Sequence, residues 1–178
     1  MYYFAYGSNM HEGDLARWCR EHGYKPITPL SREVAVLRGW KLVFNYYSTT
    51  RGGGAANIKP QEGSEVWGIL MELSEEDYEI IRRKEGAPHY YEEITVSVVT
   101  RDGGIVDNVK TFRVVEERES GGFIPPTREY INLLIEAAEE HQFPEYYTGM
   151  LKSIETNHRR GAPTSRGKSL DASQRSLR

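Results

Sequence analysis

Tyr2-Tyr3-Phe4-Ala5-Tyr6-Gly7-Ser8-Asn9 is the stretch that decides the fold, because it joins a strand signal to an abrupt stop. The aromatic-rich residues 2–6 predict a short first strand. The three turn formers at 7–9 end that strand. Residues 7–9 therefore lie on a connection to a following helix, where backbone N–H groups can point at an anion.

The predicted helix after this turn runs from about residue 12 to residue 22, and Gly23 follows as its C-cap. Its apolar face repeats at i, i+3, i+4 and i+7, through Leu15, Trp18, Cys19 and His22. Cys19 is the one cysteine of the chain. Its place on this face favours burial in the core over a role as a nucleophile.

Farther along, strand signals dominate up to residue 73. Strands are expected over 34–47, with a turn near Arg38-Gly39, over 55–58 and over 66–73. Arg51-Gly52-Gly53-Gly54 is interpreted as a flexible loop. No phosphate-binding loop is present there, since Ala55-Ala56 follows where such a loop needs a lysine and a hydroxyl.

The second half alternates helices with one hairpin. Ser74 caps a helix over 75–84, and Gly86 and Pro88 end it. Two strands over 90–99 and 109–115 form the hairpin, with Asp102-Gly103-Gly104 in the turn region. Two more helices are expected, one starting at Pro125-Pro126-Thr127 and one running from Pro144 to about Thr156.

This order lacks a regular βαβ alternation, so a doubly wound sheet is not expected. The pattern instead predicts an α+β (mixed α/β) fold, with a small, partly closed, mostly antiparallel β-barrel flanked by helices. The length of 178 residues fits one domain over 1–157, followed by a basic, disordered tail over 158–178.

Charge is divided unevenly between these two parts. The tail carries six basic residues against Asp171, a net of +5, so the net charge of −3 leaves −8 for residues 1–157 (−3 − 5 = −8). An acidic body argues against a nucleic-acid surface. The single cysteine suits a reducing compartment, and no segment has the length of a membrane span or the pattern of a signal peptide. We therefore expect a cytoplasmic protein without membrane contact.

Glu85 is the most informative ionisable residue. It ends the predicted 75–84 helix, where the negative end of the helix dipole disfavours a charged carboxylate. A raised pKa is what a general base working near neutral pH requires. Taken alone, such a residue is more often a surface glutamate. The five histidines show no metal-ligand spacing, and no metal site is expected.

These weak signals coincide with one family. The segment Phe4-Ala5-Tyr6-Gly7-Ser8-Asn9-Met10 resembles the opening motif of the γ-glutamylcyclotransferase family, which includes γ-glutamylamine cyclotransferases and AIG2-like proteins. Residues 54–58 and 65–70 are similar to its central strands, and Lys84-Glu85-Gly86 with Tyr91 resembles its catalytic segment. Pro144, Tyr147 and residues 151–154 resemble its C-terminal helix region. The resemblance covers most of residues 2–157.

Family membership implies release of 5-oxoproline from a γ-glutamyl amino acid or amine, by attack of the α-amine on the γ-carbonyl. It implies that Glu85 is the catalytic acid and base. The substrate-binding residues would be Tyr6, Gly7, Ser8, Asn9 and Tyr91, with Tyr130 and Tyr147 as weaker carry-overs. No cofactor is implied, and the partner is a small γ-glutamyl substrate on a monomer or homodimer.

Three alternatives remain open on the sequence. The chain could cleave another amide, such as γ-glutamyl-lysine or a γ-glutamyl-masked biosynthetic intermediate. It could be a non-catalytic binding module with the same fold, because fold alone does not fix function. It could bind RNA through its basic tail, although the acidic body makes nucleic acid the least favoured partner.

Overall fold

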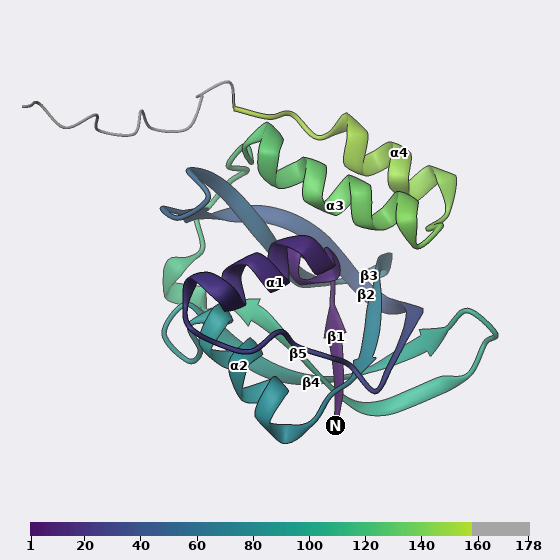
Figure 1. The fold of residues 1–178 in the computed structure, drawn as a ribbon. Helices are drawn as coiled ribbons and strands as arrows, with labels where there is room; N and C mark the ends of the chain where they lie inside the picture. The colour runs from purple at the N-terminus through teal and green to yellow at the C-terminus, as the bar shows by residue number, and fades with distance from the viewer. Residues whose placement is uncertain (158–178) are drawn as a thin grey trace, which may run out of the picture.

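The computed structural model describes residues 1–157, which form a closed five-stranded barrel with helices packed around it (Figure 1). The strands are β1 (Tyr2–Ala5), β2 (Ser31–Ser48), β3 (Gly53–Glu72), β4 (Tyr91–Thr100) and β5 (Ile105–Val114). The α-helices are α1 (Glu12–Glu21), α2 (Glu75–Glu85), α3 (Arg128–Glu140) and α4 (Glu145–Ser153), and the short 3-10 helices are η1 (Ser8–Met10) and η2 (Glu116–Arg118). The basic tail predicted over 158–178 lies outside the described residues.

The barrel has the strand order β1-β3-β2-β4-β5. Four neighbouring pairs are antiparallel, and the parallel pairing of β1 with β5 at Tyr3 and Lys110 closes the ring. The prediction of a mostly antiparallel barrel flanked by helices is confirmed. The closure is complete where the sequence indicated a partly closed barrel, because the short first strand lies between β3 and β5 and leaves no open edge in the ring.

The turn predicted near Arg38-Gly39 is also wrong. β2 continues through this point. The strand pair has a bulge there, because Arg38 to Trp40 of β2 lie opposite the longer segment from Pro60 to Glu65 of β3. Gly39 supplies the left-handed conformation that the bulge needs, with a φ of 77°. β3 likewise runs without interruption through the gap between the predicted strands over 55–58 and 66–73.

The glycine-rich segment is shorter as a loop than predicted. Gly53 and Gly54 already belong to β3 and are buried, and Gly54 N–H donates to the carbonyl of Pro125 at 3.0 Å. A Cβ on Gly54 would lie 2.0 Å from the carbonyl oxygen of Ile124. Glycine is thus required here by the close approach of two backbones.

Local capping explains where the helices start and stop. The Ser74 hydroxyl accepts from Asp77 N–H at 3.1 Å, as the capping box predicts, and Gly86 ends α2 in the left-handed conformation with a φ of 64°. Thr127 caps α3 in the same way as Ser74 caps α2. α4 ends at Ser153, three residues earlier than expected.

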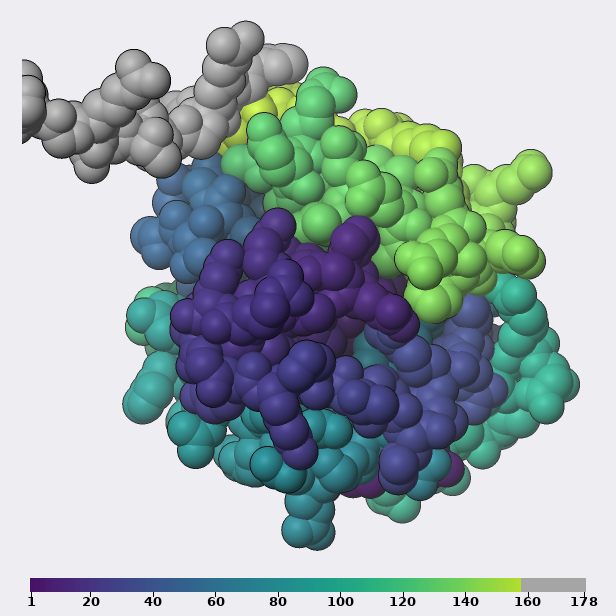
Figure 2. Space-filling view, viewed as in Figure 1, coloured from purple at the N-terminus to yellow at the C-terminus, as the bar shows by residue number. Residues whose placement is uncertain are grey.

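The helices cover the barrel unevenly. Figure 1 shows α3 and α4 side by side along one side of it, with α2 on the far side of α1. In Figure 2 the purple N-terminal segment fills the middle of the visible face, between green residues of the α3 region and teal residues near α2.

Cys19 on α1 is fully buried, as predicted. None of the helices among residues 1–157 is long and apolar enough to cross a membrane.

Candidate active site

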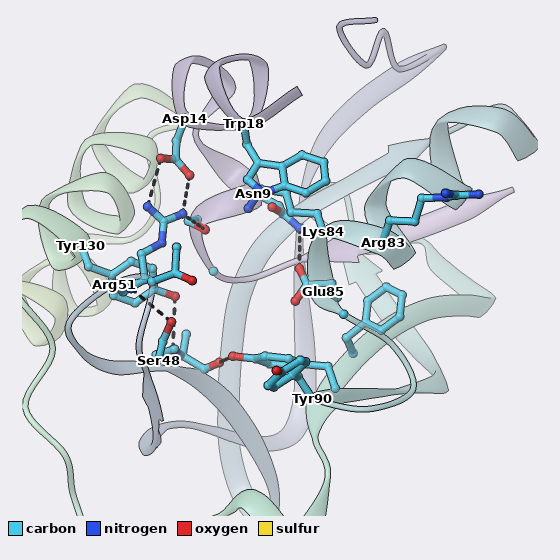
Figure 3. Close-up of a pocket in the computed structure, with 18 of the residues that line it drawn as sticks. Asn9, Asp14, Trp18, Ser48, Arg51, Arg83, Lys84, Glu85, Tyr90 and Tyr130 are labelled. Carbon is cyan, nitrogen blue, oxygen red and sulfur yellow. Dashed lines mark hydrogen bonds and ion pairs between the residues drawn. The ribbon is translucent and has the colours of Figure 1, made fainter. Parts of the chain in front are cut away.

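A cavity of about 640 Å³ opens between η1, α1, the tip of the β2–β3 hairpin and the end of α2 (Figure 3). Its lining includes all six residues that the sequence singled out, Tyr6, Gly7, Ser8, Asn9, Glu85 and Tyr91. The turn after β1 and the C-terminus of α2 therefore meet at one hollow, although they are far apart in the chain. Tyr147 is not part of this lining and instead packs against Phe143.

Glu85 lies at the inner part of this cavity, on the last turn of α2. Its Oε1 accepts a hydrogen bond of 2.6 Å from Asn9 Nδ2, and the same amide donates to the Tyr3 hydroxyl at 2.9 Å. Asn9 is almost completely buried, so its amide is fixed by packing. The hydrogen bond orients the Glu85 carboxylate toward the open space shown in Figure 3.

The pKa of Glu85 is raised above its ordinary value, mainly because burial disfavours the charged form. The Lys84 charge, the Asn9 hydrogen bond and the Arg51 charge all act to lower it, and burial outweighs them. The direction of the shift agrees with the sequence analysis, and the largest cause is desolvation of the carboxylate. Such a carboxylate is suited to exchanging protons near neutral pH.

The predicted tyrosines shape the walls of the cavity. The Tyr6 hydroxyl donates to the carbonyl of Phe112 at 2.6 Å, and the Tyr91 hydroxyl donates to the carbonyl of Ala56 at 3.0 Å. Burial is the main cause that raises the pKa of each phenol. Because both protons are already donated to backbone, these rings fix the shape of the site and do not serve as acids.

Arg51 is a cavity residue that the sequence analysis missed. Its guanidinium binds Asp14 through two hydrogen bonds of 2.6 and 3.1 Å, and donates to the Ser8 hydroxyl at 3.1 Å. Asp14 is only 2% exposed. Burial acts to raise the pKa of Asp14, but the hydrogen bonds and charge of Arg51 hold it below its ordinary value. No sequence signal links the hairpin tip to α1, since the two residues are 37 positions apart.

Tyr130 and Lys84 complete the inner surface. The Tyr130 hydroxyl accepts from Ala56 N–H at 3.2 Å, its ring lies under the Arg51 guanidinium at 5.2 Å, and burial raises its pKa to about 12. Lys84 lies next to Glu85, with its Nζ 6.0 Å from the centre of the Trp18 ring. Burial lowers the pKa of Lys84, while the Glu85 charge opposes that change.

The arrangement combines a proton-exchanging carboxylate with groups that can bind an anion. Residues 7–9 begin the helical turn η1, whose first N–H groups have no partner within the turn, and Arg51 lies beside Ser8. A zwitterionic ligand could place its ammonium at Glu85 and its carboxylate near residues 7–9. Among residues 1–157, no cluster of side chains has the composition of a metal site.

Comparison with known proteins agrees with this geometry. Residues 65–151 match the AIG2-like family. The chain is 30% identical to gamma-glutamylcyclotransferase from Bos taurus over 164 residues, which covers 89% of this chain and 81% of that one. It is 30% identical to the Homo sapiens protein of the same name, over 87% of this chain and 79% of that one. A solved structure named gamma-glutamyl cyclotransferase superposes with a TM-score of 0.76 at 26% identity, covering 93% of this chain and 94% of that chain.

Proposed function

Since this chain belongs to the γ-glutamylcyclotransferase family, we propose that it releases 5-oxoproline from γ-glutamyl compounds, with Glu85 as the proton-transferring residue. The observation that carries the proposal is the Asn9–Glu85 pair in the cavity. A partly buried carboxylate with a raised pKa faces open space, and one of its oxygens is held by a buried amide at 2.6 Å.

The reaction needs a neutral α-amine, because an ammonium has no lone pair for attack. Glu85 accepts a proton from the ammonium, and the amine nitrogen then forms a bond to the γ-carbonyl carbon. The bond from that carbon to the leaving nitrogen breaks, and Glu85 returns a proton to the departing amine. The ammonium loses two protons in all. One passes through Glu85 to the leaving nitrogen, and the other is released to solvent, from which the freed amine takes up a proton to become an ammonium. A group with a pKa raised toward neutrality can act in both directions.

Geometry supplies much of the remaining acceleration, because both reacting atoms belong to one molecule. The γ-glutamyl chain must fold back to bring its amine to its own γ-carbonyl. The rigid walls formed by Tyr6 and Tyr91 favour such a compact conformer, since both rings are fixed by hydrogen bonds to backbone. No covalent bond to the protein and no added group is needed for the ring to close.

We assign the anion site to residues 7–9 together with Arg51. Backbone N–H groups at a helix start and a guanidinium are both suited to a carboxylate or a developing oxyanion. The hydrogen bonds that Arg51 donates to Asp14 and Ser8 fix the position of its guanidinium. The α-carboxylate of the substrate would then lie on the Ser8 side of the cavity, opposite the ammonium at Glu85.

The test is 5-oxoproline release from a panel of γ-glutamyl amino acids, γ-glutamylamines and γ-glutamyl-lysine. Glu85→Gln should fold normally and lose at least about 100-fold in rate, the usual size of an acid–base contribution. Glu75→Gln is the matched control, since Glu75 is an exposed residue of the same helix. Absence of 5-oxoproline from every substrate would overturn the proposed reaction. Near-normal turnover by Glu85→Gln would overturn the role of Glu85.

A further inference from the structure

Lys84 is a partly buried cation without a carboxylate partner. It lines the cavity beside Glu85, and its Nζ lies 6.0 Å from the centre of the Trp18 ring. No carboxylate of residues 1–157 lies within 4.0 Å of this Nζ. A lysine taken out of bulk water is normally paired, because leaving its charge uncompensated is costly.

The neighbouring carboxylates already have partners. Asp14 binds Arg51 through both oxygens and also contacts Arg17. Glu85 accepts from Asn9. The pKa of Lys84 is lowered, first by burial, with the Glu85 charge acting against this and the Arg51 charge adding to it. The charges of Glu85 and Asp14 act on this ammonium from a distance, but no carboxylate of the described residues contacts it, so the ammonium is available to a ligand in the cavity.

This inference rests on the proposed reaction. In that reaction, neither charged group of the glutamyl half of the substrate binds Lys84. The α-ammonium faces Glu85, and the α-carboxylate faces residues 7–9 and Arg51. A second anionic group would have to come from the leaving half. An amino acid or peptide joined through its nitrogen carries such a carboxylate, whereas a simple amine does not.

We propose that Lys84 binds the carboxylate of the leaving amino acid, and that it is the specificity-determining residue for leaving groups that carry a carboxylate. The indole of Trp18, which stacks on His22 with ring centres 4.2 Å apart, forms the adjoining wall. A γ-glutamylamine bound in the same pose leaves the Lys84 charge without a counterion. The site thus selects γ-glutamyl amino acids over γ-glutamylamines.

The matched substrate pair for the test is γ-glutamylalanine and γ-glutamylethylamine, which differ by one carboxylate on the leaving half. Wild-type protein should show a kcat/KM at least about 10-fold higher for γ-glutamylalanine, the size expected of one charge-assisted hydrogen bond. Lys84→Met should lose that preference. Loss of the Lys84 charge also shifts the pKa of Glu85, which affects both substrates alike, so the readout is the ratio of the two kcat/KM values, which should fall toward one through a higher KM for γ-glutamylalanine. Lys84→Arg, which keeps the charge, should retain part of the preference.

Arg83→Met controls for loss of a positive charge from α2, since Arg83 is exposed and its side chain points away from Glu85 in Figure 3. Equal losses on both substrates with Lys84→Met would overturn the proposal, because they would place Lys84 on the α-carboxylate or on the pKa of Glu85. Unchanged selectivity in Lys84→Met and in Lys84→Gln would overturn it as well.

Binding to Glu85→Gln separates this inference from the proposed function. Calorimetric titration of both compounds into Glu85→Gln, with and without Lys84→Met, reports selectivity without any turnover. Preference for γ-glutamylalanine that disappears with Lys84→Met supports the Lys84 assignment even if wild-type protein releases no 5-oxoproline. Turnover by wild type without such a preference would instead leave the reaction standing and overturn the role of Lys84.

Discussion

Asn9 Nδ2 lies 2.6 Å from Glu85 Oε1 and joins two segments that are 76 residues apart in the chain. Asn9 comes from the short helix after the first strand, and Glu85 is the last residue of α2. The bond fixes one oxygen of the carboxylate. It also favours the charged form of Glu85, which burial disfavours. Asn9 therefore controls both the position and the proton affinity of the proposed catalytic group.

Removal of this amide should move the acid limb of the pH profile. Asn9→Leu deletes the hydrogen bond that lowers the pKa of Glu85, so that pKa should rise further. The acid limb of the kcat/KM profile reports the pKa of Glu85 in the protein without substrate. In Asn9→Leu this limb is therefore expected at higher pH than in wild type. The measurement is a pH profile of 5-oxoproline release for both proteins.

Tyr3→Phe is the control for this experiment. It removes the other partner of the Asn9 amide and leaves the bond to Glu85 in place. The acid limb should move less in Tyr3→Phe than in Asn9→Leu. A limb that stays fixed or moves to lower pH in Asn9→Leu would contradict the assigned role of Asn9.

Glu85 should reduce the stability of the folded protein at neutral pH. Its pKa is raised on folding, so the folded state binds the proton more tightly than the unfolded state. The contribution of Glu85 to the free energy of unfolding is complete at pH values below its pKa in the unfolded state. It is lost as the pH rises through its pKa in the folded state. Glu85→Gln should therefore have a higher Tm than wild type at pH 7 to 8, and the difference should shrink below about pH 4, near the ordinary carboxyl pKa. An equal or lower Tm at pH 8 would contradict this.

The Asp14–Arg51 pair should anchor the hairpin tip to α1. Breaking a buried pair leaves one charge uncompensated, so Asp14→Asn and Arg51→Met should each lower the free energy of unfolding by about 3 kcal/mol. The double variant should lose less than the sum, with a coupling of at least about 1 kcal/mol in urea denaturation. Strictly additive losses would show that the pair contributes nothing as a unit.

The same pair has a defined pH window. Because the pKa of Asp14 is lowered in the folded state, its contribution is complete above the unfolded pKa of about 3.9. That contribution is lost as pH falls through the folded pKa. The difference in unfolding free energy between wild type and Asp14→Asn should therefore be constant from pH 6 to 8 and shrink below about pH 4.

Gly68, like Gly54, should resist replacement by a residue with a side chain. A Cβ there would lie 2.3 Å from the carbonyl oxygen of Ala5 and 2.5 Å from the Phe4 ring. Gly68→Ala should cost about 1–3 kcal/mol or more, as overpacking does. Gly121→Ala is the control, because its Cβ meets no atom within 4 Å. Equal thermal stability of the two variants would contradict this assignment.

Local chemistry was readable from the sequence because it depends on neighbours in the chain. The Ser74 cap, the Gly86 stop and the 102–104 turn follow from residues a few positions apart, and each is present. The 2–9 segment indicated a strand that ends in a turn, and residues 7–9 do line the cavity. The bulge at Gly39 was mistaken for a turn, since both use a glycine with positive φ.

The sequence by itself determined the order of the elements, the acidic character of residues 1–157 and the candidate role of Glu85. Tertiary structure decided what surrounds that carboxylate. Arg51, Asp14 and Lys84 reach the cavity from three different elements, and no periodicity or spacing connects them. Only folding creates the burial that raises the pKa of Glu85 and lowers the pKa of Lys84, because desolvation depends on packing between distant segments of the chain.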